Sequence, residues 1–343
     1  MDKKKLIILV LFLSFSFLFV QIASINKKNL WPIYKANYGT IVKNAQVGYK
    51  KRNINTVLRF VNYSPYGSYM NYESKSFVES SRLKFDEHGI PTIKYSNSFF
   101  YNPVTIAQYA LSYYGKSLVD VLRYRLKFLQ ITDFLLDLKG KDGAFRYPFE
   151  WKYYLTNEIY QPGWISGMAQ GQALSVFSRA FHITGDERYI NAAKSVFRFL
   201  ITPKEKGGPM VSLADLDPSL DNYVFFEEYR STPNNYTLNG YMFTLIGIYD
   251  YIKALEDNYM SSSVARYYFN KGVESLLHLL PYYDLNGFTS YDLGHYTFDK
   301  PPHIGVGYHS VHIYLLHALY KTVPEHIASN LKYFEVKWHD YTR

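Results

Sequence analysis

Apolar side chains recur at helical spacing through most of the chain beyond residue 103. The clearest apolar stripe runs from Tyr189 to Leu200 and follows the turn-forming pair Gly185-Asp186. Residues 117–120 have the form of a capping box, Ser-x-x-Asp, ahead of an apolar helix at 121–129. Further helices are predicted at about 166–182, 236–255, 263–280, 308–322 and 325–340. Helices of this length, joined by loops with Gly, Pro and Asn, predict a mainly α domain of helical hairpins.

Residues 27–100 follow a different pattern, in which short alternating runs are separated by Gly, Pro, Asn and Ser. The runs at 39–42, 55–61 and 80–85 fit strands and turns better than helices. We therefore predict a small β-containing region ahead of the helical domain, which would span residues 101–343.

The first 26 residues contain an apolar segment with a basic start. Lysines at positions 3–5 precede residues 6–25, whose strongly polar member is Gln21. About 20 apolar residues are enough to cross the hydrocarbon core of a membrane, and flanking cations stay on the cytoplasmic side. This length favours an uncleaved anchor over a cleaved signal, because residues 22–24 are a poor small-residue cleavage site. In both cases we expect the domain outside the cytoplasm, anchored to the membrane or secreted.

Composition narrows the function without specifying it. The 343-residue chain has 48% hydrophobic residues, enough for a large core, and a formal net charge of +9, which favours an anionic partner. The absence of cysteine excludes disulfides, thiolate zinc sites and cysteine nucleophiles. Zinc-finger spacing, a Gly-rich phosphate loop and a basic-region helix are all missing, so we predict no nucleic-acid partner. Most of the 36 tyrosines are expected to pack in the core, although aromatic faces also line sugar-binding clefts.

Three polar clusters, at residues 162–173, 226–233 and 308–312, interrupt the apolar periodicity. The first places amides and glycines at a helix entrance, the second a carboxylate beside a phenol, and the third a phenol beside imidazoles. Such groups suit sugar binding and proton transfer. In this order the clusters resemble the D-glucuronyl C5-epimerases, which invert carbon 5 of glucuronic acid residues inside a polysaccharide. The resemblance runs from about residue 88 to the C-terminus and includes the segment at 237–240.

The resemblance implies that the helical domain is an (α/α) barrel that binds its substrate in a cleft at one end. Inverting carbon 5 requires removal of a proton α to a carboxylate and return of a proton to the opposite face, while charge on the carboxylate is stabilised. By the same resemblance, the proton-transfer groups are Glu228, Tyr229 and Tyr308. Tyrosine is a poor base at neutral pH, because its usual pKa is about 10, but it is a serviceable acid.

Other residues of the matching segments are expected to bind the substrate. They are Trp164, Gln170, Gln172, Asn239, Tyr291, His295, His309 and His312. Gln170 and Gln172 are two positions apart, so only one is expected to face the sugar while the other secures the backbone. Gly294 stands where the family usually carries an arginine, and Arg230 stands where it usually carries a proline. From its proximity alone, Arg230 is a candidate replacement for the missing cation.

Three functions stay open at this point. The chain is a polysaccharide glucuronyl C5-epimerase, a polysaccharide lyase on a similar helical barrel, or a noncatalytic binder of acidic glycans. We expect no cofactor and no metal, because the His-x-x-His spacing of His309 and His312 is a weak ligand signal. The expected partners are an anionic, heparosan-like polysaccharide and, through the N-terminal segment, a membrane; a homodimer is an open alternative to a monomer.

Overall fold

The computed structural model describes residues 38–51 and 62–340. The predicted membrane segment at residues 6–25 and the predicted strand at 55–61 therefore lie outside the described residues. Within the described ranges, no helix combines the length and the hydrophobicity needed to cross a bilayer.

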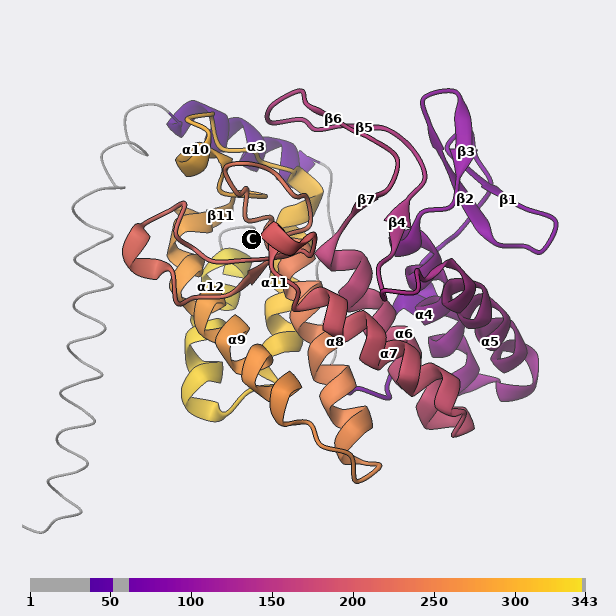
Figure 1. Ribbon diagram of the computed structural model, residues 1–343. Helices are drawn as coiled ribbons and strands as arrows, with labels where there is room; N and C mark the ends of the chain where they lie inside the picture. The colour runs from indigo at the N-terminus through magenta and orange to yellow at the C-terminus, as the bar shows by residue number, and fades with distance from the viewer. Residues whose placement is uncertain (1–37, 52–61, 341–343) are drawn as a thin grey trace, which may run out of the picture.

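The described chain is mainly helical, as the sequence pattern predicts (Figure 1). Its principal helices are α3 (Gly39–Lys51), α4 (Pro103–Val119), α5 (Val121–Leu138), α6 (Gly167–Thr184), α7 (Glu187–Leu200), α8 (Leu238–Glu256), α9 (Ser263–Tyr283), α11 (Val306–Tyr320) and α12 (Glu325–Asp340), with the single turn α10 (Gly294–Thr297). Short 3-10 turns lie at η2 (Tyr72–Ser74), η3 (Lys204–Lys206) and η4 (Pro218–Leu220).

Four helical hairpins form two layers. The inner helices α4, α6, α8 and α11 pack side by side in that order, and each also packs against the helix that follows it in the chain (Figure 1). The helices α6 and α8 are almost entirely buried along their length. Glycines allow this close contact, since a Cβ on Gly247 would lie only 1.9 Å from the Gly171 carbonyl oxygen. Two layers of paired helices fit the predicted hairpins, whereas closure into a complete (α/α) barrel stays a prediction.

Most of the predicted helices from residue 103 onward agree with the observed ones to within a few residues. The helix predicted at 121–129 is longer than expected, since α5 continues to Leu138, and the predicted capping box is not formed. Asp120 is the N-cap of α5, where its carboxylate accepts a hydrogen bond of 3.0 Å from the Arg123 backbone. Ser117 instead lies inside α4 and donates to the Tyr114 carbonyl. Asp caps a helix N-terminus as well as Ser does. Asp120, the second member of the predicted Ser-x-x-Asp pair, is therefore itself the N-cap of α5.

The strands are short and antiparallel. They are β1 (Leu83–Phe85), β2 (Pro91–Tyr95), β3 (Ser98–Phe100), β4 (Arg146–Tyr147), β5 (Trp151–Lys152), β6 (Ile159–Tyr160), β7 (Trp164–Ile165), β8 (Met210–Val211), β9 (Phe225–Phe226), β10 (Asp284–Leu285) and β11 (Phe288–Thr289). The first three form a sheet in which Lys84 pairs with Thr92 and Ile93 with Phe100, and β2 contacts α4. The others pair as β4-β7, β5-β6, β8-β9 and β10-β11.

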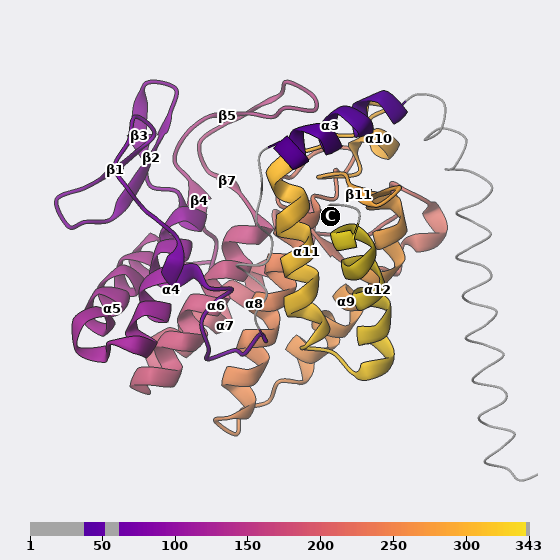
Figure 2. The same ribbon diagram turned by 180° about the vertical axis from the view of Figure 1, so that it is seen from behind.

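The prediction of a strand at residues 39–42 is wrong, because these residues begin the helix α3. Val42 and Tyr49 are one helical face of α3, and they pack against Leu285 and Phe288 of the β10-β11 hairpin. Figure 2 shows α3 lying across the start of α11, which it also contacts. Burial of this face outweighs the β propensity of the Thr-Ile-Val run.

Candidate active site

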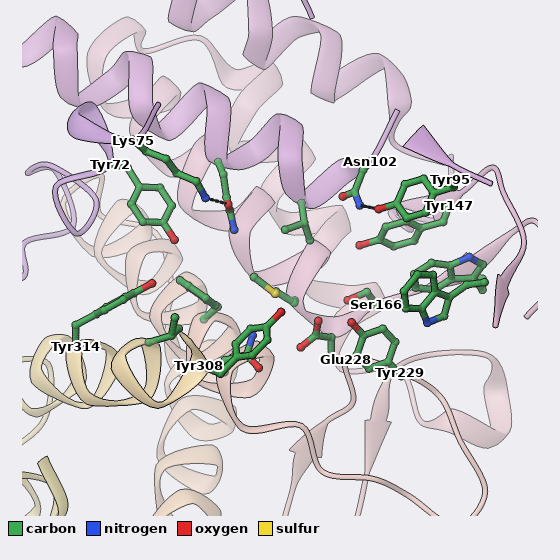
Figure 3. A pocket seen from close by; sticks show the side chains of 18 residues that line it. Tyr72, Lys75, Tyr95, Asn102, Tyr147, Ser166, Glu228, Tyr229, Tyr308 and Tyr314 are labelled. Carbon is green, nitrogen blue, oxygen red and sulfur yellow. Dashed lines mark hydrogen bonds between the residues drawn. The ribbon is translucent and has the colours of Figure 1, made fainter. Parts of the chain in front are cut away.

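A cavity of about 330 Å³ lies at the end of the inner layer where its helices begin (Figure 3). Its lining includes Asn102, the N-cap of α4, and Ser166, which immediately precedes α6. Asn239 and Tyr308 line it from the first turns of α8 and α11. Helix N-termini carry unpaired N–H groups and the positive end of the helix dipole. This convergence makes the cavity favourable for an anionic ligand.

Aromatic side chains from the short strands form one wall of the cavity. Trp164 of β7 stacks on Tyr147 of β4 with ring centroids 3.8 Å apart, and its indole N–H donates to the Phe149 carbonyl at 3.0 Å. Tyr95 of β2 accepts a hydrogen bond of 2.6 Å from the Asn102 amide. Trp164 is therefore held in a fixed orientation at the cavity edge, as suits a surface on which a sugar ring stacks.

Glu228 follows β9 and is a buried carboxylate in the lining of the cavity (Figure 3). Its Oε2 atom has no hydrogen-bond partner within the described ranges. Burial raises the pKa of Glu228 to about 7, and the adjoining Tyr229 side chain opposes the shift. Gly240 makes room for this carboxylate, because a Cβ there would lie 2.2 Å from Glu228 Oε2. Glu228 is thus placed against the first turn of α8, poised to gain or lose a proton near neutral pH.

Phenols surround this carboxylate. Tyr229 and Tyr308 line the cavity, and Tyr291 contacts Tyr308 with ring centroids 4.4 Å apart. Burial raises the pKa of each of the three, and the negative charge of Glu228 raises it further. In Figure 3 the Glu228 carboxylate and the Tyr308 hydroxyl point into the same space. The arrangement combines one carboxylate that can act as a base with phenols that stay protonated and can act as acids.

The predicted histidine ligands lie elsewhere. His309 and His312 are fully buried and do not line the cavity. His309 Nε2 donates to the Trp338 carbonyl at 3.2 Å, so its Nδ1 accepts from the Thr289 hydroxyl at 3.0 Å. The Thr289 oxygen in turn accepts from His312 Nδ1 at 2.8 Å. The two imidazoles join α11 to β11 and α12, and burial lowers the pKa of His309 to about 3, which keeps its ring neutral.

His295 and the two glutamines are also absent from the lining. His295 contacts the Tyr296 ring in a tilted arrangement with centroids 4.3 Å apart, and burial lowers the pKa of His295 to about 4. Gln170 secures backbone: in the amide orientation that its neighbours require, it donates to the Gly143 carbonyl and accepts from the Phe145 N–H, both at 3.0 Å. Gln172 is fully buried, and its amide has no partner among the residues described. Of the predicted ligands, the structure brings Trp164, Asn239 and, through its ring contact with Tyr308, Tyr291 to the site.

Sequence reasoning missed the far end of the cavity. Lys75, just after η2, is the only cation among the described residues of the lining. Its ammonium donates to the Gln108 amide oxygen from α4 and lies 4.9 Å from the centre of the Tyr72 ring. Arg230 does not line this cavity, because its guanidinium donates to the carbonyls of Lys204 at 2.9 Å and Gly207 at 3.3 Å. Lys75, from the segment before α4, is therefore the cation that the described lining of this cavity offers, whereas Arg230 lies outside it.

Comparison with known proteins finds similar sequences that each match about half of this chain. Over 198 residues the chain is 33% identical to a D-glucuronyl C5-epimerase of Caenorhabditis elegans, a match that covers 55% of this chain and 31% of that protein. Over 185 residues it is 30% identical to an uncharacterized protein of Methanocaldococcus jannaschii, covering 50% of this chain and 56% of that one. The chain therefore spans about a third of the nematode protein and about half of the archaeal one.

Among solved structures, a polysaccharide lyase matches 68% of this chain and 58% of its own, with a TM-score of 0.42 and 8% identity. A TM-score of this size is too low for the two chains to be assigned one fold. The family described as D-glucuronyl C5-epimerase C-terminus matches residues 139–340. This match covers more than half of the chain and includes Glu228, Tyr229 and Tyr308. The protein therefore belongs to the D-glucuronyl C5-epimerase C-terminus family.

Proposed function

We propose that this protein is a polysaccharide glucuronyl C5-epimerase that converts glucuronic acid residues to iduronic acid in a heparosan-like polymer. The observation that carries the proposal is the placement of Glu228, with its pKa near 7, among protonated phenols in one cavity. Family membership supports the reaction type, and the basic chain supports an anionic polymer as substrate. The polymer would reach the cavity outside the cytoplasm, where the predicted anchor at residues 6–25 would hold the domain. We also propose that the four hairpins form part of an (α/α) barrel.

In the proposed reaction Glu228, directly or through the Tyr229 hydroxyl, accepts the proton from carbon 5. The C–H bond breaks, and its electron pair moves into the adjoining carboxylate to give an enediolate. Tyr308 then donates its hydroxyl proton to the opposite face of carbon 5, where the new C–H bond forms. The Tyr308 phenolate recovers a proton from solvent, and Glu228 loses one to solvent. Proton number and charge are therefore restored after each turnover.

The negative charge that builds up on the substrate carboxylate must be stabilised for this step to be fast. Lys75 and the helix N-termini at Ser166 and Asn239 supply positive charge and dipoles in the same cavity. All three come from elements that are anchored in the core, so they need little rearrangement when the charge develops. This is the second observation in favour of enolate chemistry at the site.

The raised pKa of Glu228 predicts the pH dependence of the reaction. Only the ionised carboxylate can accept the carbon 5 proton, so kcat/KM should rise with pH and level off above about 7. The phenols, whose pKa values are raised, should stay protonated, so no fall is expected at moderately alkaline pH. Solvent deuterium incorporation measured between pH 5 and 9 tests this. A profile already flat below pH 6 would remove Glu228 as the group that titrates.

The proposed function is tested by incubating the full chain with glucuronate polymers in deuterium oxide. We expect deuterium to enter carbon 5, observed by proton NMR, while the polymer keeps its length. An unsaturated product that absorbs in the ultraviolet would instead indicate a lyase, because both reactions begin with loss of the same proton. Binding without exchange on any polymer of the panel would make the protein a noncatalytic glycan binder. Either result would overturn the proposal.

A further inference from the structure

A second cavity, of about 390 Å³, shares the lining residue Trp164 with the first. Because Trp164 lines both, the two cavities adjoin the same aromatic side chain. The second cavity is also lined by Lys204 and Arg230, and by one acidic residue, Glu158. Two cations against one carboxylate give this cavity a net positive charge.

The cations of this cavity are held by neutral groups. The Lys204 ammonium donates to the Asn234 amide oxygen at 2.8 Å and to the Ser231 carbonyl. The Arg230 guanidinium donates to the carbonyls of Lys204 and Gly207. Backbone and amide oxygens fix the two side chains in place without cancelling their charge, so both remain able to attract an anion.

Two hydrogen-bond donors in residues that line the second cavity lack an acceptor. Arg230 Nε and the Tyr160 hydroxyl are buried and form no hydrogen bond within the part of the chain that the structure describes. Both residues line the second cavity. A buried donor without an acceptor is unfavourable, and the oxygens of an anionic group would supply the missing acceptors. Charge and unsatisfied donors therefore both favour an anion.

We propose that the second cavity binds a further anionic group of the polysaccharide, on a sugar beyond the one held in the first cavity. This inference rests on the proposed function, since it takes the polymer in the first cavity to be the ligand. A chain that crosses the edge of Trp164 would occupy both cavities at once. The group is a carboxylate or a sulfate, which share the charge and the oxygen acceptors that Arg230 and Lys204 recognise.

The test compares affinities of the full chain for glucuronate oligosaccharides of increasing length by calorimetry. We expect Arg230→Gln to weaken binding of the longer oligosaccharides about 10-fold, as for loss of a charge-assisted hydrogen bond, and to leave the shortest unaffected. Lys206→Gln is the matched control: it removes the same charge from an exposed side chain in the same η3 turn as Lys204, outside the cavity. It should change affinity less than 2-fold, because an exposed charge is screened by salt.

Lys204→Gln is a second variant, which removes the other cation of the second cavity. Circular dichroism checks that this variant keeps its fold, because Lys204 also supports the 231–234 turn. An unsulfated polymer and a carboxyl-reduced, sulfated polymer distinguish the two sources of the anionic group. Equal weakening of short and long oligosaccharides by Arg230→Gln, or equal effects of Arg230→Gln and Lys206→Gln, would overturn the inference. Failure of the proposed function would look different: carbon 5 exchange would be absent, while the length-dependent effect of Arg230→Gln on binding remained.

Discussion

Glu228→Gln should remove most proton exchange at carbon 5 while the fold and polysaccharide binding persist. The amide keeps the size of the side chain but cannot accept the proton, so we expect kcat to fall about 10²- to 10⁴-fold, the usual effect of losing a positioned acid or base. Affinity should change little, because the amide is neutral and Glu228 itself is half protonated near pH 7. The measurement is deuterium incorporation at saturating polymer, with binding followed separately.

The neighbouring Glu227 offers a matched control for this variant. Glu227 is also fully buried, and burial raises its pKa to about 8, so it carries its proton at neutral pH. It does not line the cavity, and its Oε1 atom accepts a hydrogen bond of 3.1 Å from the Tyr236 backbone, which a glutamine oxygen can also accept. Glu227→Gln should therefore leave exchange nearly unchanged. Similar rates in both variants would show that neither carboxylate is the base.

Tyr308→Phe extends the same argument to the proposed acid. Only a hydroxyl is lost, and the ring contact with Tyr291 is retained, so binding should persist while inversion falls. In this variant the carbon 5 proton should still exchange with solvent while iduronate formation falls, because abstraction by Glu228 does not need the Tyr308 proton. Tyr314→Phe, also in the cavity lining, is the control phenol. Full inversion by Tyr308→Phe would contradict its assignment as the acid.

The helical hairpins could be predicted from the sequence because their apolar stripes are long. In each helix, apolar residues recur at helical spacing and mark the face that is buried. The helix α3 could not, since its burial depends on Leu285 and Phe288, more than two hundred residues further along the chain. A local pattern carries no information about such a partner. At residues 39–42 only the β propensity is visible in the sequence, and tertiary packing overrides it.

The candidate site likewise contains residues that the sequence predicts correctly and residues that it does not. Glu228, Tyr229 and Tyr308 lie in motifs that resemble one family, and the fold brings all three to one cavity. His309 and His312 lie in the same motif, but the helix α11 turns them into the core, where Thr289 and Trp338 complete their hydrogen bonds. Polar identity near a catalytic residue does not determine which face of a helix it occupies. Burial and hydrogen-bond partners, which only the fold reveals, decide between a ligand and a structural residue.

Lys75 was not predictable, because it lies in no motif and reaches the cavity only through the packing of η2 against α4. We expect Lys75→Met to raise KM for the uronate polymer about 10- to 100-fold, which corresponds to loss of a charge-assisted hydrogen bond of about 1.5–3 kcal/mol. Methionine keeps the unbranched side chain, so packing against Tyr72 should survive. If Lys75 also stabilises the enediolate, kcat should fall as well.

The control for this variant is Lys84→Met, which removes the same charge from an exposed lysine on β1. Its ammonium likewise lies over an aromatic ring, 5.0 Å from the centre of Phe99, but it does not line the cavity. Lys84→Met should leave KM within about 2-fold, and Lys75→Arg should restore part of the lost affinity, because arginine also pairs with carboxylates. On a carboxyl-reduced polymer, Lys75→Met and the unaltered protein should bind equally weakly. If Lys75→Met weakened binding of the reduced and the intact polymer by the same factor, the lysine would be supporting the cavity wall, and the substrate carboxylate would have to be bound elsewhere.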